Sequence, residues 1–344
     1  MFPYLLILFF TIIVFISHSF CNERENRITG ILWCFVMSVF VGFQDGIGVD
    51  SSTYRSWAYM ESGGFHDVSA MGVVYLVNYY HLPDFFIFFI YTFVAYFFLT
   101  LFLLQYPKDY RVIGALLLFS NIYFIQSFNI IRQIAAASVF IYGVSLFIKG
   151  NKYSYVFLAF SALIHLTALL GIIMLFVSRF LKLGKPLFVV YIASIFIFLM
   201  GGVVQHLKSL TAILAVYDDH YEYLTDKEVN VYAGVGLQYL LTLSYGMFLY
   251  FQRKNPLLLK YQKTVLVTFV GLILYNLLAS DITFFRMSYY FYFFIYVSVP
   301  LLIEVLDKKN RHAIAIGLSL VYVFQFVVLI SSNKNFFPYK NVLF

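Results

Sequence analysis

The chain has 344 residues and a formal net charge of +7, and 62% of its residues are hydrophobic while only 11% are charged. A soluble domain carries about 25% charged residues, so this composition indicates an integral membrane protein rather than a soluble enzyme. The basic residues do not cluster on one segment, so the positive charge does not predict nucleic-acid binding.

Apolar runs recur along the whole length, and a membrane-spanning helix needs roughly 20 apolar residues, or fewer where neighbouring helices shield it. The runs predict an all-α, polytopic integral membrane protein with about twelve hydrophobic segments. These segments lie near 3–20, 28–43, 84–104, 112–127, 133–148, 153–164, 167–180, 186–204, 235–251, 264–280, 285–304 and 312–330. The run at 71–80 is too short to span and predicts a re-entrant or interfacial helix.

The sequence shows no boundary between separate domains. No linker rich in Gly, Ser or Pro divides the sequence, so residues 1–344 are interpreted as one integral membrane domain, with extracytoplasmic loops near 44–83 and 205–234. Residues 1–20 lack a basic first region and an A-x-A site, which favours a membrane helix over a signal peptide. Cys21 and Cys34 show no metal-like spacing, so we expect no disulfide, no metal and no cofactor.

The lysines and arginines alternate strongly between successive turns. Most of the 23 basic residues fall in turns on one side: Arg24, Arg27, Lys108, Arg111, Lys149, Lys152, Arg179, Lys182, Lys185, Arg253, Lys254, Lys260, Lys263, Lys308, Lys309 and Arg311. The positive-inside rule places these turns in the cytoplasm, so both termini are expected outside. The cytoplasmic turns are too short to form an enzyme, so any chemistry is expected in the membrane or at its outer face. The arginines left outside are Arg55, Arg132 and Arg286.

The first polar constellation is Gly46-Ile47-Gly48-Val49-Asp50, followed by Tyr54 and Arg55. Glycines there permit a tight turn and a close approach of the backbone to a ligand. The Gly-x-Gly pattern is no dinucleotide fingerprint, because no strand precedes it and the third glycine is missing. The alternative interpretation is a helix-ending turn with solvated charges.

The second constellation is Asn129-Ile130-Ile131-Arg132-Gln133, which lies between two apolar runs. An ionisable residue at membrane depth is a functional hypothesis by default, and a guanidinium is always charged and binds phosphate through two hydrogen bonds. The alternative is an arginine whose side chain snorkels to the outer headgroups.

Three further segments carry polar groups at the predicted outer face. His165 sits between two short apolar runs that form one broken element, and it could exchange a proton or donate to a phosphate, or be an ordinary hydrogen-bonded interior histidine. Asp281 and Arg286 lie about one helical turn apart, as an ion pair or as a second anion-binding arginine. The tail Phe337-Pro338-Tyr339-Lys340 alone would be an aromatic interface anchor.

Taken in order, these segments resemble the motifs of the EpsG-like group of Wzy polysaccharide polymerases. The first resembles that family's "R-x-G-x-G-x-D-x-x-x-Y" segment, with Gln44 in place of the arginine. The run from Asn129 to Ala135 is similar to "N-x-x-R-Q-x-x-A". Arg286 with Tyr289 and Tyr290 resembles a late "R-x-x-x-Y" segment, the tail resembles a "P-Y" ending, and the family has a histidine where His165 falls.

The resemblance implies a glycosyltransferase of the GT-C-like, polytopic, lipid-linked kind. Such enzymes join undecaprenyl-pyrophosphate-linked oligosaccharide repeat units of O-antigen, capsule or exopolysaccharide on the periplasmic face, in the lipid bilayer, and release undecaprenyl pyrophosphate. A Wzz-like chain-length regulator and a flippase are expected partners, and nucleic acid is not.

Residue roles follow from the resemblance and the chemistry together. Arg132 and Arg286 are expected to stabilise charge on the departing pyrophosphate. Either Asp50 or His165 could be the base for the acceptor hydroxyl, and His165 could instead donate to the pyrophosphate. The expected substrate-binding residues are Gly48, Tyr54, Arg55, Gln133, Tyr290, Tyr339 and Lys340.

Three other functions share parts of this pattern. If the protein is an O-antigen ligase, a knockout should accumulate unligated polymer. If it is a flippase for lipid-linked sugars, a knockout should have no capped lipid A core. Loss of a polymerase instead leaves a lipid A core capped with a single repeat unit. A membrane O-acyltransferase would also use an intramembrane histidine, but it loads acyl groups from the cytoplasm, and the short cytoplasmic turns disfavour it.

Overall fold

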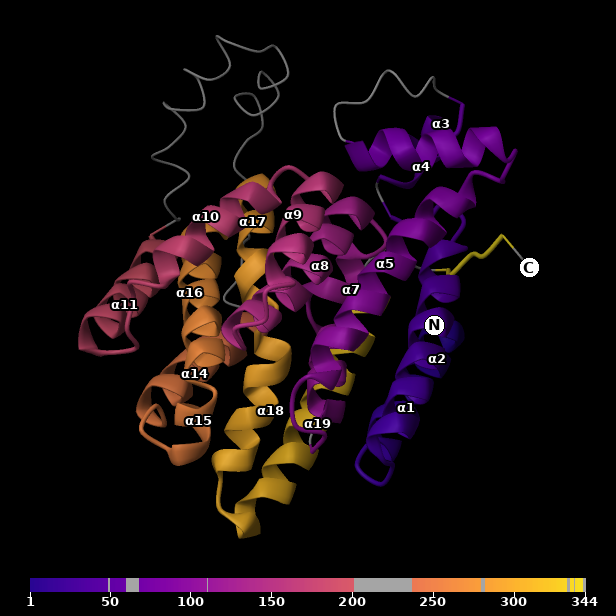
Figure 1. The fold of residues 1–344 in the computed structure, drawn as a ribbon. Coiled ribbons are helices and arrows are strands. Elements are labelled where there is room, and N and C mark those ends of the chain that lie inside the picture. Colours follow the sequence, from indigo (N-terminus) through magenta and orange to yellow (C-terminus); the bar gives the residue numbers. More distant parts are fainter. Residues whose placement is uncertain are drawn as a thin grey trace. The chain divides into compact units, whose positions relative to one another are not determined.

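The computed structural model describes residues 1–48, 50–59, 68–109, 111–200, 237–279, 282–332, 335–336 and 338–342. Every regular element within these ranges is an α-helix (Figure 1), and the sole β-type pairing there is an isolated bridge between Gln44 and Asn341. The all-α prediction is therefore confirmed for the described part of the chain. The predicted loop at 205–234 and Asp281 lie outside the described residues.

The chain forms two compact units, of which the first comprises Met1–Ile172 with Ile295–Phe344, and the second Ile173–Phe294. The helices of the first unit are α1 (Phe2–Ser17), α2 (Glu23–Gly42), α3 (Ser51–Trp57), α4 (Val68–Tyr79), α5 (Phe85–Leu104), α6 (Arg111–Ser120), α7 (Ile122–Gln126), α8 (Ile131–Ile148), α9 (Ser154–Ile164), α18 (Ile295–Val305) and α19 (Lys308–Ser332). α10 (Ala168–Ser178) begins in the first unit and ends in the second. The second unit also contains α11 (Lys185–Leu199), α14 (Leu237–Phe251), α15 (Pro256–Lys260), α16 (Gln262–Leu278) and α17 (Ile282–Tyr292).

Wherever the structure describes the predicted apolar ranges, helices lie within each of them, but few of these helices pass the length and composition test for a membrane crossing. Among the described residues, α5, α8 and α19 are long and apolar enough, and α17 with α18 makes a fourth if that pair is one span. These apolar helices fit a membrane-embedded protein, while the count of about twelve segments remains a prediction. The predicted segment at 112–127 is divided, because Asn121 ends the run of α6 and its side chain accepts the Ile122 N–H to cap α7 at 2.6 Å.

The first unit is organised around α5, which packs against both α2 and α8. α2 comes closest at Gly42, where an added Cβ would lie 2.6 Å from the Phe89 Cα, so only glycine fits without a shift. Two or more turns further along these helices the core is aromatic. Trp33 packs edge-on against Tyr96 at 5.6 Å, and its indole N–H donates to Thr11 at 2.9 Å. Buried ring polar groups need such partners.

The two ends of the first unit differ in character. Lys108 donates to the Cys21 carbonyl at 3.3 Å and Lys149 donates to the Gln105 carbonyl at 3.2 Å, so these basic turns share one end. Towards the other end lie α3 and α4, transverse to α1, α2 and α5 (Figure 1). α4 is the helix that occupies the short apolar run predicted at 71–80. The motif segments that belong to the first unit, at 44–55, 129–133 and 338–340, lie towards this second end.

Candidate functional site

The loop after α2 is the first component of the site. Gly46 and Gly48 have positive φ values of 66° and 90°, a conformation that favours glycine. A Cβ on Gly48 would lie 2.5 Å from Asn129 Oδ1 and 2.7 Å from the carbonyl oxygen of Phe128. The glycine of the first sequence motif therefore lies directly against the turn that begins the second motif.

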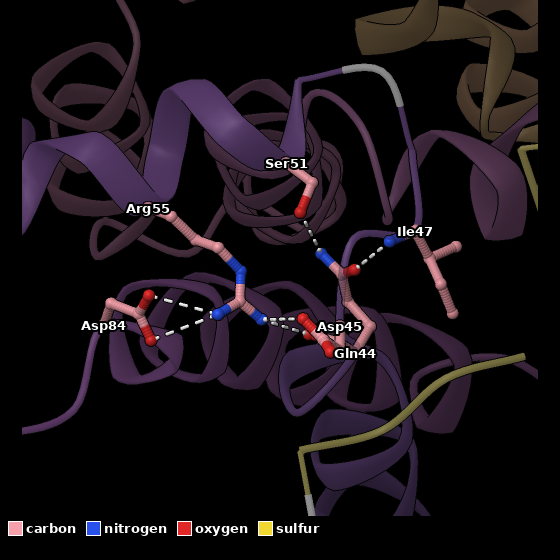
Figure 2. A network of polar contacts seen from close by, with 6 residues as sticks. All are labelled: Gln44, Asp45, Ile47, Ser51, Arg55 and Asp84. Atoms are coloured by element: carbon pink, nitrogen blue, oxygen red, sulfur yellow. Dashed lines mark hydrogen bonds and ion pairs between the residues drawn. The ribbon is translucent and has the colours of Figure 1, made fainter.

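Gln44 closes this loop from within (Figure 2). Its side chain is fully buried, its Oε1 accepts the Ile47 N–H at 2.6 Å, and its Nε2 donates to Ser51 Oγ at 3.5 Å. The residue that replaces the family's usual arginine thus has an internal, structural role in this chain. Asp50 follows at the N-cap position of α3, is partly exposed, and makes no side-chain capping hydrogen bond.

Arg55 on α3 joins three parts of the first unit, as Figure 2 shows. Its Nη1 donates to both oxygens of Asp84 at 3.3 and 3.1 Å, just before α5. Its Nη2 pairs with Asp45 at 3.1 Å and donates to the Gln44 carbonyl at 3.0 Å. Two carboxylates already balance this guanidinium, so the contacts that are present make Arg55 a positioning residue. Its predicted contact with substrate stays a prediction.

Arg132 lies in the first turn of α8, where the N-cap residue Ile130 offers no side-chain hydrogen bond. Its guanidinium carbon is 4.6 Å from the centre of the Trp57 ring, within cation–π range. Tyr54, one helical turn before Trp57, packs edge-on against that ring at 4.7 Å and is itself buried. α3 therefore places an aromatic ring against the guanidinium of Arg132. Gln133, the next residue of α8, is buried.

Trp57 is a site residue that sequence reasoning missed. The available signal was its spacing: it follows Tyr54 by three residues, and residues three apart share one face of a helix. A tryptophan on the same face as a motif tyrosine was thus a candidate from the sequence. Its partner Arg132 is remote along the chain, so that pairing needed the structure.

His165 interrupts the helical run between α9 and α10 in an extended conformation. Its Nδ1 accepts the Thr167 N–H at 3.3 Å and lies 2.8 Å from the Thr167 hydroxyl. An accepting Nδ1 puts the proton of the neutral ring on Nε2. The neighbouring Ile164 carbonyl accepts the Ser69 hydroxyl at 2.8 Å, so α4 is tied to this break.

The C-terminal tail covers the loop after α2. The Lys340 carbonyl accepts the Asp45 N–H at 3.0 Å, and the Phe43 carbonyl accepts the Val342 N–H at 2.9 Å. The Tyr339 ring stacks on Phe40 at 4.4 Å, and its hydroxyl donates to the Phe40 carbonyl at 2.7 Å. The Lys340 side chain is exposed. The tail is thus a built part of the site's frame.

Arg286 and Tyr290 belong to the second unit, on α17. Tyr290 is fully buried and Arg286 is partly exposed. α17 is fixed closely to α16, because a Cβ on Gly271 would lie 2.5 Å from the backbone of Phe291 and Tyr292. The first unit holds the remaining predicted site residues, and most of them converge in one region: Gly48, Asp50, Tyr54, Arg55, Arg132, Gln133, Tyr339 and Lys340.

The convergent group has a clear chemical character. It holds cations and one partly exposed carboxylate, that of Asp50, beside aromatic faces, and within the described ranges no group of His, Cys, Asp and Glu could hold a metal ion. Aromatic faces and paired polar groups suit sugars, and guanidinium suits phosphate.

Comparison with known proteins gives one match. No curated protein and no solved structure matches the chain. The model of the EpsG family matches residues 27–341, which includes every motif segment from Gly46 to Lys340. This chain belongs to the EpsG family.

Proposed function

We propose that this protein polymerises undecaprenyl-pyrophosphate-linked oligosaccharide repeat units at the extracytoplasmic face of the bacterial inner membrane. Membership of the EpsG family supports a polysaccharide polymerase, and the apolar helices support a membrane-embedded one. The acceptor hydroxyl oxygen attacks the anomeric carbon of the growing glycan. The bond from that carbon to the pyrophosphate breaks, and undecaprenyl pyrophosphate leaves.

The observation that carries the proposal is the setting of Arg132. Its guanidinium stands at the first turn of the 18-residue helix α8 and rests on Trp57. A helix N-terminus has a partial positive charge, and an arginine in the first turn adds a full positive charge beside it, so the two together favour an anion. An arginine held at this point is therefore suited to a pyrophosphate, whose charge rises as it departs.

The remaining roles follow from hydrogen bonding. The Nδ1 of His165 accepts the Thr167 N–H, which puts the proton of the neutral ring on Nε2, so His165 is assigned as a hydrogen-bond donor to the leaving pyrophosphate. Asp50 makes no capping hydrogen bond to α3, so its carboxylate is the better base for the acceptor hydroxyl. Arg286 is proposed as a second pyrophosphate contact. The Wzz-like regulator and the flippase remain proposed partners.

The test is polymerisation in vitro with purified protein and a lipid-linked repeat unit. Arg132→Ala is expected to abolish long chains while the protein still inserts and purifies normally. Lys152→Ala is the matched control, because it removes a cation from the opposite, basic end of the first unit, and it should polymerise normally. Long chains from Arg132→Ala at the wild-type level would contradict the proposal.

The same preparation separates the alternative functions. A flippase or a ligase would give no polymer from a purified lipid-linked unit, and an O-acyltransferase would need an acyl donor. Chain growth from the single lipid-linked substrate is expected only of a polymerase.

A further inference from the structure

A groove of about 720 Å³ lies between α1, α6 and α19 in the first unit. Its volume falls within the about 300–1,000 Å³ of small-molecule sites. The walls carry large apolar side chains that remain exposed, among them Ile16 at 46%, Ile316 at 62% and Leu320 at 66%. Exposed apolar surface on this scale marks a place that another apolar group covers.

One end of this groove is charged. Lys308, Arg311 and His312 line it there together with Asp109. The Nη2 of Arg311 donates to the carbonyls of Glu304 at 2.5 Å and Leu306 at 3.2 Å, so its guanidinium is anchored at this end. With histidine neutral, two cationic side chains, Lys308 and Arg311, line this end against one carboxylate, Asp109, so positive charge is in excess there. An anchored cation binds an anion with less loss of side-chain freedom.

We propose that this groove binds an anionic glycerophospholipid, with the phosphate at Lys308 and Arg311 and an acyl chain along α1, α6 and α19. The apolar walls favour a lipid over a soluble phosphate, and a partner helix would leave the basic end without an anion. The groove opens among the basic turns, at the end of the first unit away from Arg132. The site is therefore distinct from the proposed polymerase site and does not depend on it.

Native mass spectrometry of the purified protein tests the proposal, with phosphatidylglycerol compared with phosphatidylcholine of the same chains. The wild type should bind one phosphatidylglycerol preferentially. Since a basic side chain near a lipid surface contributes roughly fivefold in affinity, Lys308→Gln with Arg311→Gln should reduce that binding at least about tenfold. The matched control, Lys152→Gln with Lys309→Gln, removes the same charge from exposed sites outside the groove and should keep the preference.

A second variant tests the apolar part without changing any charge. Ser319 lines the groove and its hydroxyl bonds only to Ala315 within its own helix among the described contacts, so Ser319→Phe should fill the groove and weaken phosphatidylglycerol binding. If Arg311→Gln impairs folding, Lys308→Gln alone should give a smaller loss in the same direction. Equal losses in the test and control pairs, unchanged binding in Ser319→Phe, or full displacement of the lipid by soluble glycerol phosphate would each overturn the proposal.

Discussion

The guanidinium of Arg132 lies over the ring of Trp57, with 4.6 Å between the guanidinium carbon and the ring centre. The two residues come from α8 and α3, so this contact joins the second motif to the helix that follows the first. Trp57 is buried against Tyr54, which fixes the plane of its ring. The orientation of the proposed pyrophosphate contact therefore depends on a residue outside every motif.

Trp57→Leu is the first prediction. A cation–π contact contributes about 0.5–2 kcal/mol, so its loss should slow polymerisation roughly 2- to 30-fold. Trp57→Phe keeps an aromatic face and should be affected less. Polymerisation rates at saturating lipid-linked unit, with unfolding temperatures measured alongside, check this. A rate loss in both variants that tracks the loss of unfolding temperature would contradict a role in orienting Arg132.

Gly48→Ala should be more damaging than Gly46→Ala. Both glycines have positive φ, which costs a non-glycine residue roughly 1–2 kcal/mol. A Cβ at Gly48 also collides with Asn129 and the Phe128 carbonyl, whereas a Cβ at Gly46 meets nothing within 4 Å. Polymer yield and unfolding temperature of the two variants, compared side by side, test this. Equal effects of the two substitutions would mean that the close contact between Gly48 and the second motif contributes nothing to activity or stability.

The two ion pairs of Arg55 should contribute unequally to the stability of the fold. The Asp84 side chain is 20% exposed and accepts two hydrogen bonds from Arg55, whereas the Asp45 side chain is 55% exposed and forms an ion pair with Arg55 through one oxygen. Exposed ion pairs contribute about 0–1 kcal/mol, so Asp45→Asn should change stability little, and Asp84→Asn should lower it more. Limited trypsin digestion after Arg55, together with the unfolding temperature, measures both. A larger loss from Asp45→Asn would reverse the assignment of Asp84 as the main partner.

The helices of this protein were largely predictable, because a long apolar run in a sequence indicates a segment that is either buried in the protein or in contact with lipid. The break at Asn121 was not, since the residues on both sides are apolar and the interruption depends on one side chain capping α7. The presence of α4 was predicted from the length of its apolar run. Its attachment to the His165 break through Ser69 joins residues 95 apart in sequence and left no local signal.

The site was predictable in part for a related reason. The residue types at Gly46, Gly48 and Arg132 were recognisable signals in the sequence. A backbone with positive φ favours glycine, and a charged residue between apolar runs is rare unless it has a function. Their partners were hidden by sequence distance: Asp84 lies 29 residues from Arg55, and the Tyr339 hydroxyl bonds to a carbonyl 299 residues away. The tail, which on its own was interpreted as an interface anchor, is hydrogen-bonded to the first motif loop, and no local signal in the sequence indicated that contact.

His165→Gln and His165→Asn should differ. If the ring donates from Nε2, the amide of glutamine can reach a similar position and donate, whereas that of asparagine is one carbon too short. We therefore expect His165→Gln to retain measurable polymerisation and His165→Asn to lose it. Single-turnover transfer from a lipid-linked unit separates the two cases. Equal inactivity of both, with normal folding, would favour His165 as the base over Asp50.

Tyr339 should make the tail sensitive to alkali. Burial raises the pKa of Tyr339 to about 12, and the hydrogen bond from Asn341 opposes this. Because the pKa in the fold lies above the ordinary tyrosine value of 10.0, the stability that the neutral hydroxyl contributes is complete below pH 10 and is lost as the pH rises through about 12. At neutral pH, Tyr339→Phe should cost about 0.5–1.5 kcal/mol, because the hydrogen bond to the Phe40 carbonyl is lost while the ring stack is kept.

Unfolding temperatures of the wild type and Tyr339→Phe, measured in detergent from neutral pH to strong alkali, test this. The other buried tyrosines ionise in both proteins, so the difference between the two isolates Tyr339. That difference should shrink between pH 10 and about 12, since only the wild type has a tail hydroxyl to ionise. A difference that stays constant across this range would show that the tail hydroxyl is not held in the buried, bonded state on which the frame of the first motif loop depends.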